Sequence, residues 1–227
     1  MNDQPRMALA RRTVLLGTAA GGVLMLPGCA AIRRYSLVQA VRRMLELAAR
    51  NAFAKLTAPD GFWDSSVARL KLPELFGSRG SVLAGILASA LVKDRLQHEF
   101  NRIARKGAKK AAPLVADVIE KIGIDNARAL LDGGPDAATA YLRRNMAGSL
   151  VQAMVPELAD GIRISNEPLV GQALGRLTGV DVGAVAQQLA GEIDDSIWKQ
   201  IGHEEAAIRA DPAATRDPIL AHVLGGR

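Results

Sequence analysis

The sequence has one cysteine, few aromatic residues and none of the short motifs that mark common metal sites. Of its 227 residues only Cys29 is a cysteine, and 4% are aromatic. A disulfide within the chain is therefore excluded. Neither HExxH nor CxxC occurs, and His98, His203 and His222 are widely separated. We therefore expect no metal site.

The motifs of common enzymes are also missing. The chain has no GxSxG elbow and no GxxxxGK[ST] or GxGxxG phosphate loop, so we expect no cofactor. The acidic pairs Asp194-Asp195 and Glu204-Glu205 are the remaining catalytic candidates. Adjacent acids on a helix are normally exposed, and Glu205 can pair with Arg209 one turn later. We favour a structural role for them; acid catalysis would require a cleft between two carboxylates.

The hydrophobic composition favours helices. Apolar residues make up 49% of the chain, and most of them are Ala and Leu, which are strong helix formers. No segment alternates strictly between apolar and polar residues over the length of a strand. The sequence predicts an all-α protein, either an antiparallel helix bundle or an irregular helical array, with no sheet.

Residues 1–28 have the layout of a signal peptide that is removed on export. Arg11 and Arg12 precede an uncharged stretch over residues 13–26, which is too short to span a bilayer comfortably. The run around the two arginines resembles a twin-arginine signal, which directs export of folded proteins. An ordinary Sec signal that contains two arginines is the alternative.

Cys29 follows Leu26-Pro27-Gly28, a run that resembles the bacterial lipobox. This resemblance implies cleavage before Cys29 and acylation of its sulfur, whereas a small buried cysteine is the alternative. Ala30 is not the Asp that retains lipoproteins at the inner membrane. We therefore expect a lipid-anchored protein on the periplasmic face of the envelope, at the outer membrane, with residues 29–35 as a tether.

Apolar periodicity predicts one helical domain over residues 36–227. On the first helix, Leu37, Val41, Met44, Leu45, Ala48 and Ala52 form one stripe, and Arg42, Arg43 and Glu46 face away. Asp125 is the expected N-cap of the helix over 126–131, with Gly133 as a left-handed stop. Pro113 is expected to open a helix, and Pro156 to kink or end one. The predicted helices are 36–56, 81–112 (one helix or two with a kink), 113–122, 126–131, 136–163, 167–178, 181–209 and 217–224.

Charge is distributed unevenly along the chain. Residues 29–55 carry six basic and one acidic side chain, and residues 111–227 carry ten basic and sixteen acidic ones. Export separates the protein from nucleic acid, so we expect no nucleic-acid partner. The basic residues near the anchor, Arg33, Arg34, Arg42 and Arg43, can contact anionic lipid headgroups or pair with the acidic C-terminal half.

Three stretches of the sequence resemble a bacterial family, the domain of unknown function numbered 4197. The resemblance covers roughly residues 40–226 and implies an exported helical protein, but it carries no activity. Thr139, Tyr141 and Arg143 lie in the central block of this resemblance. The chain departs from the family after Asn101 and Arg102, where Arg105 stands in a region that is more often acidic. The stretches are residues 61–62 with 70–73, then 124–127 with 130–134 and 136–143, and finally 201–212.

The candidate ligand-binding or structural positions are therefore Asn101, Arg102, Thr139, Tyr141, Arg143, Glu205 and Arg209. For Tyr141 and Arg143 we favour packing over contact with an anionic ligand. The leading hypothesis is a non-enzymatic envelope lipoprotein that serves as a binding or scaffolding module, with a lipid or an envelope protein as partner. The rivals are a carrier with an apolar helical cavity for lipid and an acid-based enzyme acting on cell-wall glycans.

Overall fold

The computed structural model describes residues 28–70, 90–165, 168 and 181–225, and throughout these ranges the regular structure is helical. The predicted all-α fold is confirmed. Residues 1–27, which include Arg11 and Arg12, and the predicted helix over 167–178, except residue 168, lie outside the described ranges. The elements are α1 (Gly28–Leu56), α2 (Gly61–Asp64), α4 (Ala90–Lys121), α5 (Ala127–Asp132), α6 (Ala137–Met146), α7 (Ser149–Arg163), α9 (Val182–Ala210), the 3₁₀ turn η2 (Ala213–Thr215) and α10 (Pro218–Leu224).

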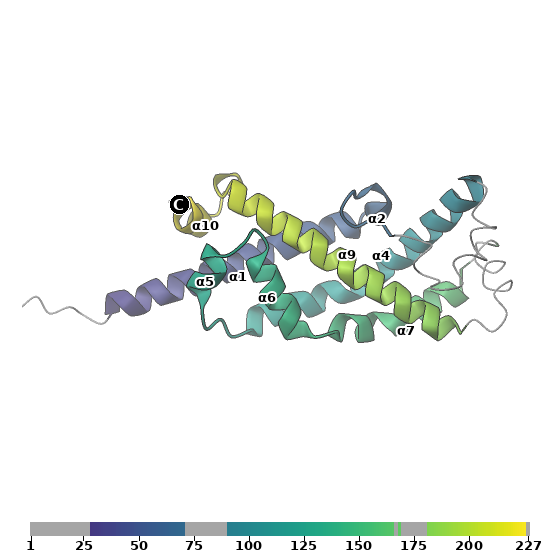
Figure 1. Ribbon diagram of the computed structural model, residues 1–227, viewed down its shortest axis with the longest axis horizontal. Coiled ribbons are helices and arrows are strands. Elements are labelled where there is room, and N and C mark those ends of the chain that lie inside the picture. Colours follow the sequence, from purple (N-terminus) through teal and green to yellow (C-terminus); the bar gives the residue numbers. More distant parts are fainter. Residues whose placement is uncertain (1–27, 71–89, 166–167, 169–180, 226–227) are drawn as a thin grey trace, which may run out of the picture.

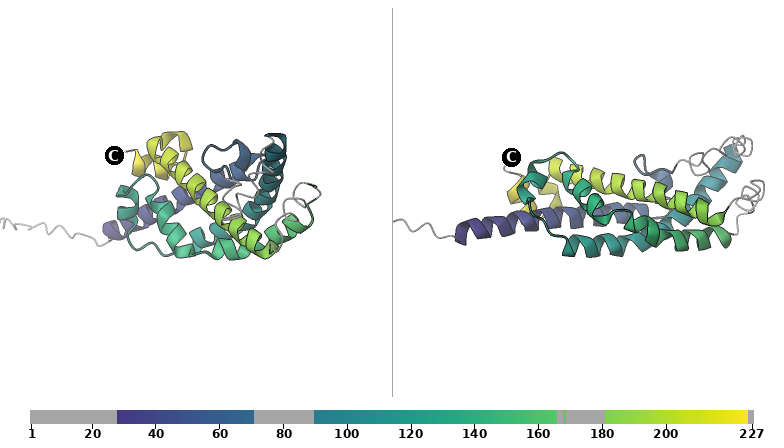
Figure 2. Two further views of the ribbon diagram at one scale, coloured as in Figure 1. Left: turned by 45° about the vertical axis from the view of Figure 1, so that its right-hand side comes forward. Right: turned by 60° about the horizontal axis from the view of Figure 1, so that its bottom comes forward.

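Four helices, α1, α4, α7 and α9, form an elongated array in which successive members run in opposite directions (Figure 1). Helix α9 crosses the array and packs against α1 and α7, while α4 packs against both α1 and α7 (Figure 2). The short helices α5 and α6 lie near one end of the array, and α2 lies against α4 towards the other end. Among the described residues, no helix is both long enough and apolar enough to span a membrane.

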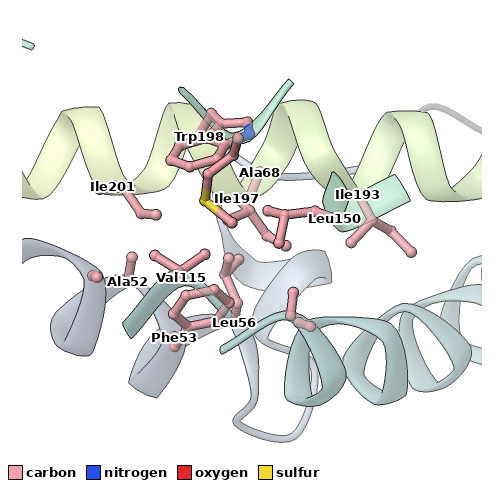
Figure 3. Close-up of a cluster of buried hydrophobic side chains, with 14 of the residues drawn as sticks. Ala52, Phe53, Leu56, Ala68, Val115, Leu150, Ile193, Ile197, Trp198 and Ile201 are labelled. Carbon is pink, nitrogen blue, oxygen red and sulfur yellow. The ribbon is translucent and has the colours of Figure 1, made fainter. Parts of the chain in front are cut away.

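The core forms where the apolar stripes of these helices meet. The stripe predicted for α1 is confirmed: Val41, Met44, Leu45, Ala48 and Ala52 are buried, and Leu37 is partly buried. Burying a large apolar side chain contributes about 1.5–3 kcal/mol. Figure 3 shows side chains of α9 facing those of α1, α4 and α7; the labelled residues are Ala52, Phe53, Leu56, Ala68, Val115, Leu150, Ile193, Ile197, Trp198 and Ile201.

Glycines allow α4 and α7 to approach each other closely. A Cβ on Gly107 would lie 3.0 Å from Cδ2 of Leu158, and a Cβ on Gly161 would lie 3.2 Å from Cγ2 of Ile103. The two contacts are reciprocal, because each glycine faces a large residue of the other helix. Larger side chains at these positions would push the helices apart.

The helix start predicted at Pro113 is wrong, and at Pro156, where a kink or an end was predicted, the helix does not end. Helix α4 continues through Pro113, and α7 continues through Pro156. Both prolines are exposed, so the backbone carbonyl groups that lose a partner are near solvent. The break in the predicted helix 136–163 falls instead at Ala147 and Gly148, which have φ angles of 36° and 76°.

The predicted ends of α5 also require correction. Its N-cap is Asn126, not Asp125: Oδ1 of Asn126 accepts a hydrogen bond from the Ala129 N–H at 3.1 Å. Gly133 has a φ of −74° and is not left-handed. Glycine is needed there for space, because a Cβ would lie 2.7 Å from that of Ala137. At the start of the chain, α1 begins at Gly28 and includes the predicted tether, residues 29–35, and Cys29.

Candidate functional site

Glu205 of α9 caps the N-terminus of α6. Its side chain is fully buried, and its carboxylate accepts hydrogen bonds from the backbone N–H groups of Ala138 at 3.1 Å and Thr139 at 2.7 Å. The Thr139 hydroxyl adds a third bond at 2.6 Å. The first N–H groups of a helix have no partner within the helix, and a negative charge is favourable at this end. Asp136, the N-cap residue of α6, makes no side-chain capping bond, so Glu205 takes over this role.

Arg209, one turn further along α9, joins Glu205 to the end of α5. Its Nε and Nη2 atoms donate to Oε1 of Glu205 at 2.9 and 2.6 Å. Its Nη1 and Nη2 atoms also donate to the carbonyl oxygens of Leu131 and Leu130, both at 2.8 Å. The predicted pairing of Glu205 with Arg209 is confirmed. The pair satisfies the C-terminal carbonyls of α5 and the N-terminal amides of α6 together.

Two side chains satisfy carbonyl groups at the C-terminal end of α4. The Tyr141 hydroxyl donates to the Gly123 carbonyl at 2.6 Å, and Nη2 of Arg42 donates to the Ile122 carbonyl at 3.1 Å. The prediction that Arg42 faces away from the core is therefore wrong, and its buried Nε atom has no hydrogen-bond partner. We call Arg42, Thr139, Tyr141, Glu205 and Arg209 the capping junction.

Arg143 bridges the acidic pair of α9. Its Nη2 atom lies 3.0 Å from Oδ2 of Asp194 and also contacts Oδ1 of Asp195. Trp198 donates from Nε1 to Oδ1 of Asp194 at 2.9 Å. Burial raises the pKa of Asp194, and the hydrogen bonds from Trp198 and Arg143 only partly oppose this effect.

The expectation that the acidic pairs are exposed is wrong for three of the four residues. Asp194, Glu204 and Glu205 are buried. Glu204 accepts hydrogen bonds from Nζ of Lys55 at 2.6 Å and from Nε2 of Gln200 at 2.7 Å. Buried carboxylates persist where such partners exist, and partners from other helices cannot be read from the α9 sequence alone.

The remaining candidates, Asn101 and Arg102, lie in another part of the array. Asn101 is buried, and its Oδ1 accepts the Phe62 N–H at 3.0 Å while its Nδ2 donates to Oδ1 of Asp60 at 3.1 Å. These bonds hold the turn before α2, where Asp60 has a φ of 54°. Asn101, which lies on α4, thus holds Asp60 of the preceding turn against this helix.

An open pocket of about 390 Å³ lies between this turn and α4. Basic residues occur on α4 at positions 95, 98, 102 and 105, a spacing that places them on one face of a helix. Two of its residues, Asn101 and Arg102, are among the candidates predicted from the sequence, but the pocket itself is not; the spacing of the basic residues was a signal for it. The basic pocket is lined by Pro59, Asp60, Arg95, His98, Glu99, Asn101, Arg102 and Arg105.

The two carboxylates of the basic pocket have partners. Arg102 donates to Glu99 from Nε at 2.8 Å and from Nη2 at 2.5 Å, and the Ser165 hydroxyl also donates to Glu99. Burial raises the pKa of Glu99, but the bonds from Arg102 and Ser165, together with the nearby positive charges, lower it below its ordinary value. Nδ1 of His98 lies 3.2 Å from Oδ1 of Asp60.

A second, more apolar depression follows α1 and α4. This α1–α4 groove has a volume of about 690 Å³, with Phe53, Ala112 and Ile119 among its apolar walls and Arg50 and Lys109 among its charged rim residues. In the part of the chain that the structure describes, no group of three or more His, Cys, Asp or Glu residues is arranged to hold a metal ion.

The fold and these contacts define an all-helical protein with a buried polar junction, a basic pocket and an apolar groove between α1 and α4. The sequence matches the family described as "Protein of unknown function (DUF4197)" over residues 31–225, and the chain belongs to this family. Comparison with the curated proteins gives no match, and neither does comparison with the solved structures.

Proposed function

We propose that this chain is an exported lipoprotein of the bacterial envelope and acts there as a binding module, not as an enzyme. Residues 1–28 would be a signal peptide, of twin-arginine type from its Arg11-Arg12 pair, and Cys29 would carry the lipid. The order of these segments supports the proposal, because Cys29 lies in the first turn of α1 and the folded array follows directly.

The basic pocket is the proposed binding site. Its walls come from one face of α4 and from the turn that Asn101 fixes, and it lies on the surface. By contrast, the carboxylates that acid catalysis would need already have other roles. Glu205 caps a helix, and Glu204 accepts hydrogen bonds from Lys55 and Gln200. Asp194, whose pKa burial raises, accepts hydrogen bonds from Trp198 and Arg143.

The location is tested with Cys29→Ser. In a bacterial host, the wild-type chain should lose its leader, gain the mass of a diacylglycerol and fractionate with membranes. The serine variant should keep neither the lipid mass nor the membrane association. Recovery of both forms from the cytosol with residues 1–28 intact would contradict the proposal.

The binding role is tested with fractionated envelope extracts and a pocket variant. Purified wild-type protein should retain material that mass spectrometry detects, and the double variant Arg95→Gln/Arg105→Gln should not. Arg144→Gln is the matched control, because Arg144 is an exposed arginine on α6, outside both depressions. Equal retention by all three proteins would place binding elsewhere.

The α1–α4 groove supports a second candidate function, that of a lipid carrier. A groove of about 690 Å³ with an apolar floor falls in the size range of small-molecule sites. Native mass spectrometry of protein purified from envelopes should then show copurified lipid. Ala116→Phe would place a ring in the groove and should reduce the bound lipid, whereas absence of lipid from the wild-type protein would end this candidate.

A further inference from the structure

We infer that the basic pocket binds a phosphate ester of about the size of a lipid headgroup. This inference names the ligand class for the proposed binding role and rests on that proposal. Its basis is the set of charged residues in the pocket. Both carboxylates have hydrogen-bond partners, whereas two of the three guanidinium groups have none among the described residues.

The acidic residues of the pocket already have hydrogen-bond partners within the protein. Glu99 receives a two-point contact from Arg102, and Asp60 accepts from Asn101 and lies next to His98. The carboxylates are therefore poorly placed to attract a cationic ligand. Cations are also disfavoured because three guanidinium groups line the same hollow.

Arg95 and Arg105 are the pocket residues whose guanidinium groups are available to bind a ligand. Among the described residues, neither makes a hydrogen bond or an ion pair. Both line the pocket, one on each side of Arg102 along α4. A guanidinium group has a planar set of donors that matches the oxygens of phosphate, and it stays charged at any physiological pH.

The dimensions of the pocket point to a phosphate with an organic body. Arg105 lies ten positions after Arg95 on α4, which is a rise of about 15 Å. A single inorganic phosphate is small beside this span and beside a volume of about 390 Å³. A phosphate ester can place its phosphate against one guanidinium group and its polar body along the remaining wall.

Trp63 provides a spectroscopic reporter next to the pocket. Its ring centroid lies 5.0 Å from that of His98, a lining residue, and the Arg69 guanidinium carbon lies 5.0 Å from the same Trp63 centroid. A ligand that contacts His98 should change the surroundings of this indole. The only other tryptophan, Trp198, is buried in α9 and bonded to Asp194.

The test titrates the purified full-length chain with defined probes while following tryptophan fluorescence and heat. The soluble probes are glycerol 3-phosphate and inorganic phosphate, with acetate at equal ionic strength as the anion control. The membrane probes are vesicles of phosphatidylglycerol and of phosphatidylcholine. Trp63→Phe identifies the part of the fluorescence change that comes from the pocket.

We expect saturable binding of glycerol 3-phosphate or of phosphatidylglycerol vesicles, and none of acetate. Arg95→Gln/Arg105→Gln should weaken this binding at least tenfold, and Arg144→Gln should leave it unchanged. Binding of the free ester identifies a soluble source, and binding of the vesicles alone identifies a lipid headgroup. Either result supports the inference, provided that the double variant loses it.

Absence of saturable binding for both glycerol 3-phosphate and the phosphatidylglycerol vesicles would overturn the inference, even if inorganic phosphate binds. Equal binding by the double variant would overturn it as well. This failure is distinct from failure of the proposed function. If the wild-type protein still retains envelope material through Arg95 and Arg105 while all phosphate probes fail, the binding role stands and only the ligand class is wrong.

Discussion

The capping junction and the basic pocket both gather charged side chains, but they use them in opposite ways. In the junction, Glu205 is fully buried and all of its contacts are with groups of the protein itself. In the pocket, Arg95 and Arg105 line a hollow without a partner among the described residues. Charges that are satisfied internally stabilise the fold, whereas charges left open at the surface are available to a ligand.

This difference separates the family signature from the proposed binding site. The central and C-terminal stretches of the family resemblance contain Tyr141, Glu205 and Arg209, which satisfy backbone groups at helix ends. They also contain Thr139, whose N–H and hydroxyl donate to Glu205. Their roles explain why short helices such as α5 and α6 keep fixed positions beside α9. Isolated helices of such length are marginal in water.

The largest expected effect comes from breaking the capping junction. Glu205→Ala leaves the Arg209 charge and two N–H groups of α6 without their partner. Removal of one member of a buried ion pair costs about 3–5 kcal/mol, so the free energy of unfolding in urea should fall by that amount. A loss below about 1 kcal/mol would mean that the junction is not a major source of stability.

A smaller effect is expected from Tyr141→Phe. The change removes the hydroxyl that donates to the Gly123 carbonyl but keeps the ring. The expected loss is about 0.5–1.5 kcal/mol, the usual contribution of one hydrogen bond. Urea unfolding provides the measurement, and Asn145→Ala, which removes a bond within the exposed face of α6, serves as a comparison. A loss as large as that of Glu205→Ala would contradict the ranking.

The helical fold follows from patterns within single segments, and the junction follows from contacts between segments. The apolar stripe on α1 and the pairing of Glu205 with Arg209 both depend on residues one turn apart, so the sequence was sufficient to predict them. The amides that Glu205 caps belong to residues 138 and 139, more than sixty positions earlier. No local pattern predicts which distant helix end a carboxylate will meet.

The same reasoning explains the errors at prolines and at the basic pocket. Proline removes one backbone hydrogen bond from a helix, and this loss ends the helix where the freed carbonyl group would be buried. Pro113 and Pro156 lie on exposed faces, and which face is exposed depends on packing. For the pocket, the basic face of α4 was visible in the sequence. Its opposite wall depends on the left-handed turn at Asp60 and on Asn101, which only the folded chain brings together.

A finer comparison uses pH and sets Glu99 of the basic pocket beside Asp194 of α9. Glu99 has a lowered pKa in the fold, so its contribution to stability is present above the unfolded pKa of about 4.3 and is lost as pH falls through the folded pKa. Asp194 has a raised pKa, so its contribution is present below about pH 3.9 and is lost as pH rises through the folded value.

The two carboxylates should therefore give opposite pH profiles. Between about pH 3 and 5, the stability of the wild-type protein relative to Glu99→Gln should increase with pH. Its stability relative to Asp194→Asn should decrease over the region just above pH 4. Thermal unfolding at closely spaced pH values provides the measurement. Profiles with the same slope for both variants would show that one of the two assignments is wrong.

The most direct test compares two variants in two assays: urea unfolding and retention of envelope material by the folded protein. We predict that Glu205→Gln lowers the unfolding free energy yet retains the material while folded. We predict that Arg95→Gln/Arg105→Gln changes the unfolding free energy by less than about 0.5 kcal/mol and loses the material. Retention by the double variant, together with its loss in folded Glu205→Gln, would place binding at the capping junction and contradict the account.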